Sequence, residues 1–236
     1  MASTNEANNV KLLAIVIGFA SLLLFVIFSR VSGTVLFTYF MSALISYLVY
    51  TNKDYVKYAV GINKKEIITS TFAAVILGGV FYAIAQLIPG FSLGVPQLSY
   101  TIAEDVRKFI IVGLSPILET LFIQGALFAV TMYILIEKIN IPKRRATFVA
   151  VFVQAVAFSL MHLSAYIIGF YNYPSFSSAL PAIFANAGAF IAAFLFSLIA
   201  MGFAVREKAK YSDLTFIIIF HMIVNFIIVA KLSIVV

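Results

Sequence analysis

The segment ILETLFIQGALF, residues 117–128, places a carboxylate, Glu119, inside an apolar run that extends over roughly residues 109–136. A helix that crosses a membrane needs about 20 predominantly apolar residues, and this run is long enough. A carboxylate at such a depth must be paired, protonated or in contact with water, because its insertion into the bilayer is costly. Glu119 is therefore a candidate functional residue, with a structural, protonated carboxyl as the alternative.

The rest of the chain has the same membrane character. Of its 236 residues, 63% are hydrophobic and 11% are charged, a composition too apolar for a soluble domain. Six more apolar runs have about the length of a membrane span: residues 12–29, 34–50, 67–88, 146–169, 179–205 and 214–235. The sequence therefore predicts an all-α, polytopic transmembrane bundle of about seven spans, with a single integral membrane domain over residues 1–236.

The net charge of +7 comes mostly from bases in short loops, at Lys11 and in the segments 53–65, 138–145 and 206–210. Seven spans put all four groups on one side, so the positive-inside rule predicts an integral protein of the cell membrane with a cytoplasmic N-terminus. This pattern does not indicate a nucleic-acid partner. The chain has no cysteine, which excludes disulfides, thiolate metal sites and a cysteine nucleophile.

Other polar side chains also lie within apolar runs. The only two histidines are His162, in AFSLMHLSAY, and His221, in IIIFHMIVNF. Asn225 follows His221 by four residues and therefore lies on the same helix face. If these faces converge with Glu119, a carboxylate, two imidazoles and an amide line one polar cavity. Taken singly, a membrane histidine or asparagine is often only an interhelical hydrogen-bonding group.

The order of these residues resembles a known family. The pattern is Glu119 with Phe122, then Phe158-x-x-x-His162, then Gly202 and a short basic loop, and finally His221-x-x-x-Asn225. Over about residues 115–226 it is similar to the CAAX prenyl protease and bacteriocin-processing (ABI) family of intramembrane glutamate proteases. The resemblance implies a protease-like core at about 109–235 and an intramembrane endopeptidase without a cofactor or a metal. It also implies membrane lipid and a membrane-associated protein or peptide as partners, a prenylated CAAX-like C-terminus being one candidate substrate.

The family's first motif, Glu-Glu-x-x-x-Arg, reads Glu119-Thr120-x-x-x-Gln124 in this chain. The second Glu and the Arg support one another in the family, and both positions are neutral here. We expect Thr120 and Gln124 to keep a weaker hydrogen bond, which leaves no unpaired buried charge. Phe158 is a third supporting residue.

The resemblance assigns catalytic roles to Glu119, His162, His221 and Asn225. Glu119, helped by His162, would hold a water and take its proton, while His221 and Asn225 would donate hydrogen bonds to the scissile carbonyl. Within the same span, Pro116 either kinks the helix or is an ordinary membrane proline. We expect Gly125 to allow a close approach of helices.

Three alternatives remain open. Two histidines and one carboxylate are also a zinc ligand set, although the His-Glu-x-x-His signature is absent. The altered first motif motivates a non-catalytic protein, immunity-like or partner-binding, on the same scaffold. A proton-coupled transporter ranks last, because no matched broken helices occur in two halves of the chain.

Overall fold

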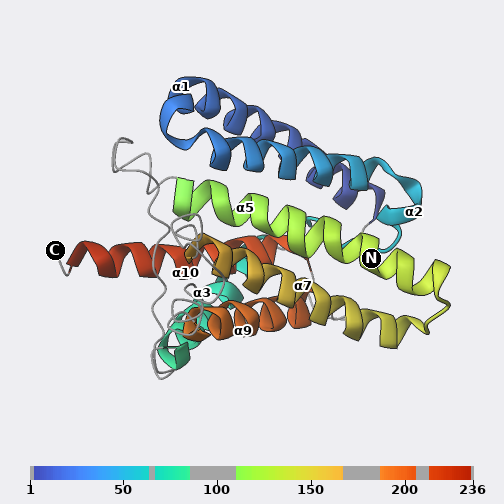
Figure 1. The fold of residues 1–236 in the computed structure, drawn as a ribbon. Helices are drawn as coiled ribbons and strands as arrows, with labels where there is room; N and C mark the ends of the chain where they lie inside the picture. The colour runs from blue at the N-terminus through green and yellow to red at the C-terminus, as the bar shows by residue number, and fades with distance from the viewer. Residues whose placement is uncertain (1–2, 64–66, 86–109, 167–186, 206–212, 235–236) are drawn as a thin grey trace, which may run out of the picture.

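The computed structural model describes residues 3–63, 67–85, 110–166, 187–205 and 213–234 (Figure 1). All regular structure in these ranges is helical, so the all-α prediction is confirmed for them. The helices are α1 (Thr4–Thr51), α2 (Lys53–Val56), α3 (Ile67–Ala85), η2 (Ile110–Leu114), α5 (Ser115–Glu119), η3 (Thr120–Leu127), α6 (Phe128–Tyr133), η4 (Ile134–Lys138), α7 (Lys143–Tyr166), α9 (Ala187–Ala204) and α10 (Leu214–Ile234).

Three of the described helical stretches are long and apolar enough to cross a membrane: Thr4–Leu24, Val112–Lys138 and Lys143–His162. Four shorter apolar stretches fall within the other expected runs: Phe37–Thr51, Ile67–Phe81, Phe190–Ala204 and Leu214–Ile227. The shorter stretches have 10–17 residues, below the length of about 20 that a span needs. The structure thus shows three helices of spanning length where the sequence predicts about seven.

Helix α1 folds back on itself as two antiparallel legs (Figure 1). The legs approach closely, since a Cβ on Gly18 would lie 3.2 Å from the Cβ of Ala43. The first leg begins with a capping box, in which the Ser3 hydroxyl accepts from the Glu6 N–H and the Glu6 carboxylate accepts from the Ser3 N–H.

The fourth expected span, residues 110–138, is one rod in which α-helical and π-helical segments alternate. Pro116 stands in the first turn of α5, directly after the π-helical η2. A proline has no N–H to donate to the preceding turn, and π-helical turns are frequent at functional sites. Glu119 is the last residue of α5, where the rod changes again to the π-helical η3.

Gly125 lets this rod pack tightly against α1. A Cβ at position 125 would lie 2.9 Å from the Tyr50 hydroxyl and 3.4 Å from Leu214. The close approach expected at this glycine is confirmed.

The segment of residues 60–63, after α2, is buried between helix ends. The Tyr50 hydroxyl donates to the Val60 carbonyl at 2.5 Å, Leu214 N–H to the Gly61 carbonyl at 2.8 Å, and the Asn9 amide to the Ile62 carbonyl at 2.9 Å. Asp213 completes the set by accepting from the Asn63 N–H at 3.3 Å and from the Phe216 N–H at 3.0 Å. Burial raises the pKa of the Asp213 carboxyl, against the effect of these hydrogen bonds.

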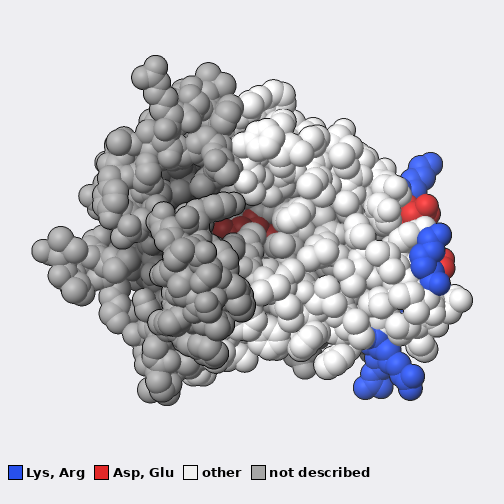
Figure 2. All heavy atoms as spheres, in the orientation of Figure 1, with Lys and Arg blue, Asp and Glu red and all other residues white. Residues whose placement is uncertain are grey.

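The described basic side chains that are visible in Figure 2 gather at one end of the molecule. Helix α2 and the start of α7 lie there in Figure 1, and their bases are exposed, among them Lys53 and Arg144. The expected loop bases at 64, 65 and 206–210 lie outside the described residues. The rest of the described surface that is visible in Figure 2 is almost free of charge.

Candidate active site

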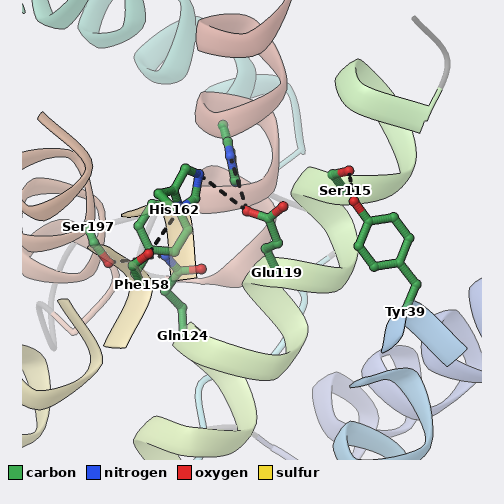
Figure 3. Close-up of polar contacts among 8 residues, drawn as sticks. Tyr39, Ser115, Glu119, Gln124, Phe158, His162 and Ser197 are labelled. Atoms are coloured by element: carbon green, nitrogen blue, oxygen red, sulfur yellow. Dashed lines mark hydrogen bonds and ion pairs between the residues drawn. The ribbon is translucent and has the colours of Figure 1, made fainter. Parts of the chain in front are cut away.

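Glu119 occupies the centre of the site. Its side chain is only 16% exposed, and its Oε2 has no hydrogen-bond partner among the described residues. One turn earlier on the same rod, the Ser115 hydroxyl forms a hydrogen bond with the hydroxyl of Tyr39, which comes from the second leg of α1 (Figure 3). Contact with α1 therefore fixes the rod next to Glu119.

His162 approaches Glu119 from α7. Its Nδ1 lies 2.9 Å from the Phe158 carbonyl oxygen, one turn earlier. A carbonyl oxygen only accepts, so Nδ1 carries a proton, and in the neutral ring Nε2 is left as an acceptor. This Nε2 lies 3.7 Å from Glu119 Oε2 (Figure 3). The ring also packs on the Phe158 ring at a centroid distance of 4.3 Å.

His221 approaches from α10. Its side chain is 3% exposed, and its Nε2 lies 3.8 Å from the same Glu119 oxygen. Aromatic rings hold its imidazole, Phe158 at a centroid distance of 5.4 Å and Phe196 at 5.0 Å. Its Nδ1 has no hydrogen-bond partner among the residues that the structure describes. Three separate helices thus bring the carboxylate and both imidazoles together.

The spacing of these three side chains leaves room for a water molecule or an ion between them. Distances of 3.7 and 3.8 Å are too long for direct hydrogen bonds. An ionised Glu119 and a neutral His162 would also face each other with acceptors, which requires a donor or a cation nearby. One ligand atom each from Glu119, His162 and His221 lie within 4.8 Å of one another. A single water or metal ion beside the line joining these atoms would satisfy them.

A cavity opens beside the histidines. Its volume is about 30 Å³, which is room for one or two water molecules. Asn225 lines it together with both histidines, so the (i, i+4) pair on α10 faces the same space. The lining residues are Phe81, Phe158, His162, Ala192, Ala193, Phe196, His221, Val224 and Asn225. Figure 2 shows acidic atoms recessed in a hollow of the otherwise uncharged surface.

The prediction of a hydrogen bond between Thr120 and Gln124 is wrong. The Gln124 amide instead donates to the Ser197 hydroxyl on α9, at 3.2 Å, and the Thr120 hydroxyl has no partner among the described residues. The reason is that Ser197 offers the amide nitrogen a buried acceptor across the helix interface. Both first-motif residues are fully buried, with 0% exposure.

The sequence reasoning missed four polar residues around the site: Tyr39, Ser115, Gln154 and Ser197. Gln154 and Ser197 are fully buried and joined by a hydrogen bond of 2.8 Å. The sequence held a signal for Gln154 and Ser197, because each of the two stands within an apolar run where a polar group needs a partner. Tyr39 gave no such signal, since a tyrosine is ordinary near a membrane interface.

The chain matches no protein-family model, no curated protein and no solved structure. The resemblance to the CAAX prenyl protease and bacteriocin-processing family therefore stays a prediction from the sequence motifs alone.

Proposed function

We propose that the protein is an intramembrane endopeptidase of the glutamate type. The observation that carries this proposal is the convergence of Glu119 with two imidazoles, at 3.7 and 3.8 Å from one carboxylate oxygen. A buried carboxylate oxygen without a hydrogen-bond partner, such as Glu119 Oε2, is costly, and a functional role explains why the chain retains it.

In the proposed reaction, a water sits between Glu119 Oε2 and His162 Nε2. Glu119 takes one proton from the water, and the oxygen attacks the carbonyl carbon of a peptide bond. His162 helps to hold the water. The hydrogen bond from its Nδ1–H to the Phe158 carbonyl keeps Nε2 turned toward the water as an acceptor. The proton then passes from Glu119 to the leaving amine.

The developing negative charge on the carbonyl oxygen needs donors. His221 Nδ1 is buried and has no partner among the described residues, and Asn225 lines the same cavity. In the proposed reaction, both donate hydrogen bonds to the oxyanion. Because these donors are held in a low-dielectric cavity, their hydrogen bonds to a charged oxygen are stronger than in water.

The substrate proposed is a membrane-associated protein or peptide, including the candidate class of prenylated CAAX-like C-termini. The proposal includes about seven spans, a cell-membrane location and a cytoplasmic N-terminus. The gathering of the described bases at one end of the molecule supports this orientation by the positive-inside rule. Membrane lipid would cover the exposed apolar side chains, such as Phe72 and Phe148.

A zinc-dependent hydrolase is the second candidate, and the ligand-atom geometry favours it. A tetrahedral zinc with bonds of about 2.0–2.1 Å places its ligand atoms about 3.3–3.4 Å apart. Glu119 Oε2 is 3.7 and 3.8 Å from the two Nε2 atoms, and the three ligand atoms lie within 4.8 Å of one another, so the three side chains would have to move closer together to bind zinc. The Phe158 carbonyl would then orient the ligand His162. Loss of activity on chelation, restored by zinc with one bound ion per chain, would favour this candidate.

The test of the proposal is cleavage of fluorogenic, membrane-anchored peptides by the protein in liposomes. The panel contains prenylated and unprenylated peptides, so that it also defines the substrate. Glu119→Gln should abolish cleavage, and chelator should leave it unchanged. The matched control is Glu137→Gln, because Glu137 is an exposed acid on the same rod. Absence of cleavage by folded wild-type protein would favour the non-catalytic, partner-binding alternative.

A further inference from the structure

A chain of three buried polar side chains connects the rod that bears Glu119 to α7, the helix that bears His162. Gln124 lies on η3, Ser197 on α9 and Gln154 on α7, and all three are 0% exposed. The hydrogen bonds run in series, from Gln124 Nε2 to Ser197 Oγ at 3.2 Å and from Ser197 Oγ to Gln154 Oε1 at 2.8 Å. Figure 3 shows Gln124 and Ser197 with the hydrogen bond between them.

The direction of these hydrogen bonds follows from backbone chemistry. Gln154 Nε2 donates to the Val151 carbonyl at 2.8 Å and lies 3.4 Å from the Ser197 carbonyl. Carbonyl oxygens only accept, so the amide nitrogen must face them and the amide oxygen must face the Ser197 hydroxyl. The single Ser197 proton is thereby used, and Ser197 Oγ can only accept from Gln124.

This direction leaves the oxygen of the Gln124 amide, Oε1, without a partner on α9. Its nitrogen is bound by Ser197, so its oxygen is turned away from α9. Gln124 Oε1 is buried and has no hydrogen-bond partner among the described residues. The same is true of Thr120 Oγ1 and Glu119 Oε2, which lie about one turn earlier on the rod. These unsatisfied oxygens on consecutive turns of the rod require partners, and for Gln124 Oε1, which can only accept, a buried water is the smallest donor.

We propose that Gln124 is a positioning residue whose amide oxygen, oriented by Ser197 and Gln154, binds a buried water on the turn that carries Glu119. The hydrogen-bonded chain of Gln124, Ser197 and Gln154, with this water, fixes the position of the Glu119 carboxylate relative to His162. The inference rests on the proposed endopeptidase function. It adds to that function a network of uncharged side chains, at the motif where the family that the sequence resembles has a charged pair. It also gives each of these two glutamines a hydrogen-bond partner in an apolar interior.

A merely structural network would stabilise the fold without affecting turnover, so the test must separate the two. Ser197→Thr and Ser197→Val add the same bulk, but only threonine keeps the hydroxyl. Gln124→Met keeps the approximate shape of glutamine and removes its amide. The matched control is Ser159→Ala, because Ser159 is equally buried on α7 and its hydroxyl bonds only to the Ala155 carbonyl of its own helix.

In liposomes, we expect Ser197→Val and Gln124→Met to lower kcat by up to about 100-fold, the cost of a misplaced catalytic group, with KM little changed. Ser197→Thr and Ser159→Ala should keep kcat near the wild-type value, and the Thr and Val variants should melt at similar temperatures. Equal kcat for Ser197→Thr and Ser197→Val would overturn the inference while leaving the endopeptidase proposal intact. Wild-type protein that cleaves nothing, or Glu119→Gln protein that still cleaves, would instead overturn the proposed function on which the inference rests.

Discussion

Replacement of Gly125 by alanine should destabilise the protein through one identifiable clash. The new Cβ would lie 2.9 Å from the Tyr50 hydroxyl, closer than van der Waals contact allows. Tyr50 is 2% exposed, and its hydroxyl donates to the Val60 carbonyl, so neither the ring nor the hydroxyl can move freely. The rod and α1 must therefore separate, or the hydrogen bond must break.

The magnitude follows from two opposing terms. Alanine is favoured over glycine in a helix by about 1 kcal/mol, which stabilises the variant. Overpacking costs about 1–3 kcal/mol, and an unsatisfied buried carbonyl at Val60 would cost about 1–3 kcal/mol. Either cost, less the gain of about 1 kcal/mol, leaves an expected net loss of up to about 2 kcal/mol. Gly79→Ala is the matched control, because nothing lies within 4 Å of a Cβ there, and it should be neutral or stabilising.

The assay is reversible unfolding in mixed micelles, followed by helical circular dichroism. A Tyr50→Phe background provides the critical comparison, because it removes the clashing oxygen itself. In that background Gly125→Ala should cost less than in the wild type. An equal cost in both backgrounds, or a stabilising effect of Gly125→Ala alone, would refute the packing argument.

Three further predictions concern the site and the basic end. Phe158→Leu should lower kcat by up to about tenfold, because it removes an aromatic contact to His162 worth about 0.5–1.5 kcal/mol, whereas Phe152→Leu on the exposed face of α7 should not. The raised pKa of Asp213 means that the folded state binds its proton more tightly than the unfolded state, so the wild-type melting temperature should fall as pH rises above the ordinary value of 3.8 and through the raised pKa. Asp213→Asn should lack this component, and parallel melting curves against pH would contradict the assignment. Lys57→Ala should leave the melting temperature unchanged at low and high salt, because the Lys57–Glu137 pair is exposed, and a clear loss would contradict this.

Much of the fold was predictable because hydropathy dominates this sequence. The seven apolar runs lie where the described structure has apolar helices, since backbone groups in an apolar environment must bond internally. Hydropathy gives no information on helix shape. It did not predict the π-helical turns on either side of α5, the segment that contains Pro116.

The site was predictable at the level of residue type. Glu119, His162 and His221 stood out because polar groups are costly in apolar runs, and the structure places them around one oxygen. Partner choice was beyond the sequence, because it depends on packing between helices distant in the chain. Gln124 bonds Ser197, 73 residues away, in preference to Thr120 on its own helix. The pairing of Tyr39 with Ser115 is likewise a product of how α1 docks on the rod.

The central claim is that Glu119 and His162 act on one water, and a double-mutant cycle on cleavage tests it most directly. We would measure kcat for Glu119→Gln, His162→Ala and the double variant in liposomes, with folding checked by circular dichroism. Each single variant should lose about 10²- to 10⁴-fold, and the double variant should lose little more than the worse single one, as for residues that act as a unit. Losses that multiply in the double variant, or single variants that retain wild-type kcat, would contradict the claim.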